Sequence, residues 1–505
     1  MSNQTSDNNK RIAKNTLLLY FRMLFMMVVS LYTSRVILNA LGVEDFGIYN
    51  VVGGVVAMFS VISGSLSAAI SRFITYELGK GDQSKLNRIF SASVTIQLLL
   101  SLIIVILIES VGVWFLNAKM TIPEDRMNAA NWVLQFSIIT FVINLISVPY
   151  NAAIIAHEKM SAFAYISILE ALGKLAIAFM IMWSPIDKLI YYAVLMGTIA
   201  VIIRLTYGRY CSKHFTECIY NFHWDSDILK KMFSFAGWNF IGSVAGILRG
   251  QGINILLNLF FNPVVNAAQG IAAQVNNAIC SFSNNFLTAV NPQIIKSYSQ
   301  KDLVRSYRLV LYASRFAFLL LLILSSPIIC ETEEILKIWL KNVPNNAPVF
   351  VRLSLGLALC DSISLPLVTL QQATGKLRNY QLVVGVLHML NFPISLLFLY
   401  LKFDAYVVYV IAIFLSLISL YARLIMQWRQ IGISIKEFHQ KVIFKVGLVG
   451  LLVFLFLLYI KTTNNLWYLN VCISLIVSIM LSLFIGLKKN EILYIVNKIK
   501  NKYEK

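Results

Sequence analysis

Apolar runs of twenty or more residues recur from one end of this chain to the other. Of its 505 residues, 58% are hydrophobic and only 13% are charged. A run of about twenty apolar residues is what an α-helix needs to cross the hydrocarbon core of a bilayer. Because lipid offers no partner to backbone polar groups, such runs must form helices. We therefore predict an all-α polytopic membrane protein.

The apolar windows predict about fourteen spans. They lie near residues 15–41, 46–76, 88–116, 129–156, 161–183, 188–210, 230–261, 264–295, 304–329, 346–373, 378–400, 404–428, 441–460 and 465–487. The first is too long for a cleaved signal peptide and is interpreted as an uncleaved signal anchor.

The basic residues predict the orientation of these spans. If both termini are cytoplasmic, about 29 of the 43 Lys and Arg residues fall inside and about 7 outside, as the positive-inside rule expects. We expect a multi-pass membrane protein with both termini in the cytoplasm. Topology also explains the formal net charge of +20, so nucleic acid is not an expected partner.

Two short patterns repeat along the chain. The pattern Asp-x-x-Lys/Arg-x-x-Arg begins at Asp82 and again at Asp302, 220 residues later. The spacing of Pro149, Ala156 and Lys159 recurs in Pro366, Ala373 and Lys376. We predict two six-helix lobes, 1–215 and 225–430, related by a pseudo-twofold axis along the membrane normal. Helices 13 and 14 (440–487) and a basic cytoplasmic tail (488–505) follow.

Basic side chains inside the predicted spans are the strongest functional signal. Each costs roughly 2.5–3.5 kcal/mol near the bilayer centre, so they must face an interior that is wet, paired or suited to an anion. Against them we count three carboxylates within spans, Glu109, Glu170 and Asp361. The seven basic residues are Arg22, Arg35, Arg72, Lys174, Arg249, Arg315 and Arg352.

Three of these cations have no acidic partner one helical turn away, and we predict that they bind an anionic substrate. They are Arg22, Arg249 and Arg315. Arg35, Arg72 and Arg352 lie nearer span ends, where they could bind substrate or snorkel to the interface.

Glu170 and Lys174 are spaced to form an in-helix ion pair, which either neutralises both or leaves Lys174 to bind substrate. Asp361 and His388 lie near the middle of their spans. They can couple proton or cation movement to transport, or simply hydrogen-bond neighbouring helices.

Amide side chains are predicted to line the same cavity. They could bind sugar hydroxyls or hold helices together. The candidates are Gln251, Asn254, Asn258 and Asn277.

Motifs for catalysis are weak. The sequence GKGDQSK (79–85) lacks the spacing of a phosphate-binding loop. Asp225-Ser226-Asp227 resembles a glycosyltransferase motif, but directly before a span it is interpreted as a helix cap. The six cysteines show no metal spacing, so we expect free thiols, no metal and no cofactor. A short interfacial helix is predicted near 330–345, and the tail is predicted to anchor at the membrane surface.

Four segments resemble a known family. ILNALGVEDFGIYNVVGGVVAMFS (37–60), SRFITYELGKGD (71–82), AHEKM (156–160) and ILKIWLKNVP (335–344) are similar to Wzx-type flippases of polysaccharide synthesis. These belong to the MOP superfamily, with the MATE multidrug exporters and the lipid II flippase. The resemblance implies a V-shaped pair of lobes around a central cavity, with no catalytic residue.

The resemblance also implies a substrate. This is an oligosaccharide linked to a polyprenyl diphosphate, such as an O-antigen or capsule unit, moved by alternating access. Membrane lipids and other polysaccharide-assembly proteins are the implied partners. A MATE-like multidrug exporter and a membrane glycosyltransferase or polymerase are the alternatives. A basic cavity argues against cationic drugs, and the absence of a large loop argues against an enzyme.

Overall fold

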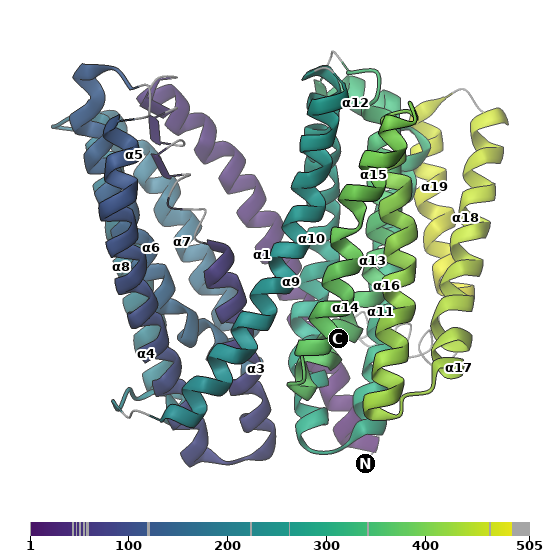
Figure 1. Cartoon of the computed structure of the whole chain (residues 1–505), viewed down its shortest axis with the longest axis horizontal. Coiled ribbons are helices and arrows are strands. Elements are labelled where there is room, and N and C mark those ends of the chain that lie inside the picture. Colours follow the sequence, from purple (N-terminus) through teal and green to yellow (C-terminus); the bar gives the residue numbers. More distant parts are fainter. Residues whose placement is uncertain are drawn as a thin grey trace, which may run out of the picture. The chain divides into compact units, whose positions relative to one another are not determined.

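A computed structural model describes residues 2–42, 45–46, 48–49, 52–53, 56, 60–118, 122–222, 225–261, 263–340, 343–463 and 466–486. Helices, and no strand, make up the regular structure of this part of the chain (Figure 1). This confirms the predicted all-α class.

Ten helical segments of the described residues are long and apolar enough to cross a membrane. They coincide with ten of the fourteen predicted spans. Helices also occupy the remaining positions 15–41, 60–76, 230–261 and 264–295, but these are not among the ten, so the count of fourteen stays a prediction.

The chain divides into two compact units. Unit 1 comprises Met1–Phe240 and Ile295–Lys301. Its helices are α1 (Ser2–Leu41), α3 (Ser60–Lys80), α4 (Gln83–Leu107), α5 (Val113–Ala118), α6 (Met127–Ala156), α7 (Met160–Met180), α8 (Lys188–His214) and the start of α9 (Ser226–Phe260). The buried apolar core between α4, α6 and α8 contains Ile104, Val133 and Leu189.

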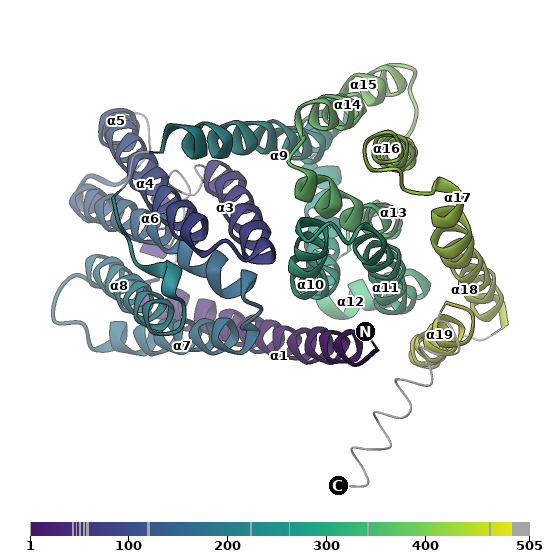
Figure 2. The same ribbon diagram turned by 90° about the horizontal axis from the view of Figure 1, so that it is seen from below.

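Unit 2 comprises Ile241–Ile294 and Asp302–Lys505. It holds the rest of α9 and α10 (Pro263–Ser299) as far as Ile294. The helices α11 (Leu303–Cys330), α12 (Thr332–Leu340), α13 (Ala347–Thr374), α14 (Arg378–Met389), α15 (Asn391–Tyr400), α16 (Val407–Ile431), α17 (Ile435–Phe438), α18 (Phe444–Thr463) and α19 (Trp467–Leu481) follow. Within this unit α18 and α19 contact each other and α11 (Figure 2). The predicted domain limits stay predictions, and residues 487–505 lie outside the described part.

The repeated sequence pattern has a local structural cause. The carboxylate of Asp82 accepts a hydrogen bond from the backbone N–H of Lys85 at the start of α4. Asp302 does the same for Arg305 at the start of α11. Such caps typically contribute ~1 kcal/mol each to helix stability. The two copies of the pattern therefore begin their helices, α4 and α11, with the same cap.

Two further sequence interpretations are confirmed. Asp225 accepts a hydrogen bond from the backbone N–H of Ile228, so it caps α9 as predicted. The short helix expected near 330–345 is α12, Thr332–Leu340. Its outer face exposes Ile338 and Trp339, whose side chains suit a membrane interface.

Candidate functional site

Unit 2 holds a charged cluster between four helices. Arg249 of α9 places its Nη1 3.3 Å from Oδ2 of Asp361 on α13. Its Nη2 donates to the backbone carbonyl of Ala412 on α16 at 3.2 Å. The side chain of Arg249 is only 11% exposed, and that of Asp361 is 35% exposed. The Arg249 guanidinium therefore pairs across helices, which the sequence did not reveal.

His388 and Arg423 complete this cluster. His388 on α14 experiences the charges of Arg249, Arg423 and Asp361, and its buried Nε2 has no hydrogen-bond partner among the described residues. Arg423 on α16 donates from Nε to the Tyr380 hydroxyl at 3.0 Å and from Nη1 to Ser419 at 3.0 Å. Counting His388 as neutral, two arginines face one aspartate, which leaves a surplus of one positive charge.

Arg423 was not among the predicted site residues, because it lies near the end of its predicted span. Its burial distinguishes it from a snorkelling cation, since the residue is only 6% exposed. A break in the helix follows His388: α14 ends at Met389, and α15 begins at Asn391. Pro393 explains the break, because its ring clashes with the carbonyl four residues earlier.

Asp361 also lines a small cavity. This cavity of about 110 Å³ is bordered by Asn276, Ser283 and Asn284 of α10. Carboxylate, amide and hydroxyl oxygens in such a space can hold a proton, a small cation or water. In the described part of the chain, no three His, Cys, Asp or Glu side chains come together as they would at a metal site.

Unit 1 contains a second charged cluster. The Arg22 guanidinium on α1 lies 4.4 Å from the centre of the Phe163 ring and experiences the negative charge of Glu170. Glu170 and Lys174 form the predicted pair on α7, with Nζ and Oε1 2.6 Å apart. Two cations again face one carboxylate.

Arg72 of α3 is buried rather than snorkelling, since the residue is only 8% exposed. Its guanidinium lies 4.7 Å from the centre of the Phe73 ring, 4.6 Å from Tyr76 and 5.5 Å from Phe235. These distances place it within range of cation–π attraction. The fixed aromatic contacts favour a packing role for Arg72 beside its predicted role in substrate binding.

Four predicted side chains lie outside the described part of the structure, namely Arg35, Gln251, Asn254 and Asn258. Asn277 is described and exposed on α10. Arg352 binds the α12 region, donating to the Ile329 carbonyl and to Glu333, each at 3.2 Å.

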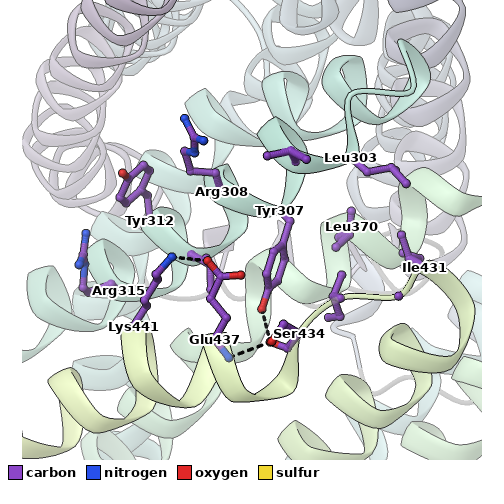
Figure 3. A pocket seen from close by; sticks show the side chains of 14 residues that line it. Leu303, Tyr307, Arg308, Tyr312, Arg315, Leu370, Ile431, Ser434, Glu437 and Lys441 are labelled. Carbon is purple, nitrogen blue, oxygen red and sulfur yellow. Dashed lines mark hydrogen bonds and ion pairs between the residues drawn. The ribbon is translucent and has the colours of Figure 1, made fainter.

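Arg315 lies apart from the Arg249 cluster. It lines a pocket of about 500 Å³ in unit 2, formed by the first turns of α11, the end of α16 and α17 (Figure 3). The same pocket contains Arg308, Tyr312 and Lys441. The structure therefore separates Arg315 from Arg249, although the sequence grouped them together.

Comparison with known proteins agrees with this architecture. The family model described as "Polysaccharide biosynthesis protein" matches residues 12–298, more than half of the chain. The "Uncharacterized membrane protein EpsK" of Bacillus subtilis (strain 168) is 24% identical over 130 residues. That match spans 26% of this chain and 26% of EpsK.

The fold resembles solved transporter structures. An outward-facing multidrug resistance MATE family transporter of the MOP superfamily aligns with a TM-score of 0.73 at 12% identity, over 84% of this chain and 96% of its own. A MOP superfamily transporter from Pyrococcus furiosus aligns with a TM-score of 0.67, at the same identity and coverage. The reverse polarity of its binding pocket was taken to suggest a different function for that protein. Together with the family match, this fold confirms the predicted resemblance: the chain belongs to the polysaccharide biosynthesis protein family and has a MATE-like helical fold.

Proposed function

We propose that this protein moves an oligosaccharide linked to a polyprenyl diphosphate across the bacterial inner membrane. The family supports a membrane exporter or flippase, and the charge of the buried clusters supports the anionic substrate. The observation that carries the proposal is the surplus of arginine over carboxylate around Arg249. A diphosphate offers the oxygens that guanidinium groups bind best.

Alternating access supplies the mechanism in this proposal. Arg249 and Arg423 attract the diphosphate and acidic sugars in unit 2, while Arg22 and Lys174 do so in unit 1. The prenyl tail stays in lipid, and the units reorient the headgroup between leaflets. Asp361 and His388 are the groups through which a proton or cation could drive the cycle.

A MATE-like exporter of cationic drugs is the second candidate, and the fold favours it. A site for cations needs a surplus of carboxylate, whereas each described cluster has a surplus of one positive charge. The proposed division of the chain into two lobes and its cytoplasmic termini suit both candidates equally.

Deletion of the gene tests the proposal. We expect loss of surface polysaccharide and accumulation of its lipid-linked unit on the cytoplasmic face. Complementation with Arg249→Ala or Arg423→Gln should fail, whereas Arg429→Gln, an exposed change on the same helix α16, should restore the polysaccharide. Full rescue by both cluster variants would refute the role of the arginines. Unchanged polysaccharide with altered drug sensitivity would favour the exporter instead.

A further inference from the structure

The pocket around Arg315 has the composition of an anion site. One face of α11 contributes Arg308, Tyr312 and Arg315, which are spaced i, i+4 and i+7 and so point the same way (Figure 3). Lys441 adds a third cation, and Glu437 is the one carboxylate of the lining. The pocket therefore has a surplus of two positive charges.

The one carboxylate of the lining is already neutralised by a lysine of the same lining. Glu437 forms an ion pair with Lys441 one turn away. Arg308 has no hydrogen-bond or ion-pair partner among the described residues, and it is exposed. Arg315 lies deeper, only 1% exposed, with its guanidinium 5.4 Å from the centre of the Tyr312 ring. Of the three cations in the lining, Arg308 is therefore the one most available to a ligand.

The position of the pocket points to a lipid. It begins where α11 starts at Leu303 and where α16 ends at Ile431, the ends of two helices long and apolar enough to cross a membrane, where such helices are expected to meet water. Arg315 lies twelve residues further along α11, or about 18 Å at the rise of an α-helix. Leu303 and Val304 form an apolar rim, 42% and 71% exposed. A lipid headgroup would enter at this level and reach Arg308, five residues or about 7.5 Å further along α11.

We propose that this pocket binds the phosphate group of an anionic membrane lipid. Basic pockets between membrane helices bind such headgroups, and a volume of about 500 Å³ suits a ligand of that size. Two lipids share this chemistry, an ordinary phospholipid and the diphosphate carrier of the proposed substrate. The site does not depend on the transport mechanism proposed for the Arg249 cluster.

Binding to the purified full-length protein in detergent micelles tests this site. The probes are phosphatidylglycerol, zwitterionic phosphatidylcholine, polyprenyl diphosphate and inorganic diphosphate, with bound lipid counted by native mass spectrometry. Arg308→Gln should weaken anionic-lipid binding about tenfold, since it removes a charged hydrogen-bond donor. Arg305→Gln is the matched control, because Arg305 lies on the same helix but its guanidinium donates to Gln293 at 3.4 Å. It should leave binding unchanged.

The binding preferences distinguish which lipid supplies the phosphate. Preference for polyprenyl diphosphate identifies the carrier lipid, and equal binding of phosphatidylglycerol identifies a general headgroup site. Equally strong binding of inorganic diphosphate, or equal affinity of Arg308→Gln and the unchanged protein, would overturn the proposal. Because this assay requires no transport, failure of the lipid site leaves the complementation result for Arg249 unaffected.

Discussion

Replacing Asp361 with Asn leaves the Arg249 guanidinium, 11% exposed, facing a neutral amide. At the observed 3.3 Å, two unit charges attract by about 5 kcal/mol at an effective dielectric constant of 20. Desolvation offsets much of this gain, and the 35% exposure of Asp361 weakens it further. We therefore expect a coupling energy of about 1–3 kcal/mol between the two side chains.

A double-mutant cycle measures this coupling. Asp361→Asn, Arg249→Gln and the double variant are compared by thermal unfolding in detergent and by restoration of surface polysaccharide. Each single variant should be destabilised, and the double variant should lose less stability than the sum of the two. Ser416→Ala is the control, because it removes the hydroxyl that donates to Asp361 but keeps the ion pair.

The functional result separates two roles for Arg249. If Arg249 binds an anion directly, the double variant recovers stability but not polysaccharide export, even though Arg423 then restores the surplus of one positive charge. Recovery of export in the double variant would show that Arg249 only neutralises Asp361. A coupling energy below about 0.5 kcal/mol would show that the pair contributes little, contrary to the magnitude worked out from its burial.

Two further predictions concern unit 1. Burial raises the pKa of the Glu217 carboxyl, but hydrogen bonds from His157 and the backbone bring it below its ordinary value of 4.5. The ionised Glu217 carboxylate therefore stabilises the fold fully above pH 4.5, and this stabilisation is lost as the pH falls through the lower pKa of the folded state. Glu217→Gln should therefore flatten the decline of the unfolding temperature under acid conditions. Gly79→Ala would place a Cβ 1.9 Å from the Ser299 hydroxyl and should lower the free energy of unfolding by about 1–3 kcal/mol. Gly64→Ala is the control on the same helix, where the new Cβ has open space and should not destabilise the protein. Thermal unfolding of both variants measures the difference.

Features that depend on neighbouring residues in sequence could be predicted. The spans follow from apolar length, and the caps at Asp82, Asp302 and Asp225 follow from side chains that bond their own helix. The pair of Glu170 and Lys174 is likewise local, since both side chains lie on one face of α7. These features need no knowledge of which helices pack together.

Partners on different helices could not be predicted in this way. Arg249 and Asp361 are 112 residues apart, and only the packing of α9 against α13 and α16 brings them together. Arg72 has aromatic neighbours on its own helix, yet its burial also depends on Phe235 from α9. The burial of Arg423 likewise could not be predicted without knowing which helices pack around it, because a cation near the end of a span can equally snorkel to water.

The division of the cations into separate clusters changes the expected effect of substituting one of them. The sequence placed a surplus of about four charges in one shared interior. The described clusters instead combine two cations with one carboxylate each, Arg22 and Lys174 with Glu170, and Arg249 and Arg423 with Asp361. Loss of a single arginine then cancels the whole surplus of its cluster. Under the proposed function, substituting either arginine in unit 2 should therefore abolish its attraction for an anion rather than weaken it by a small fraction.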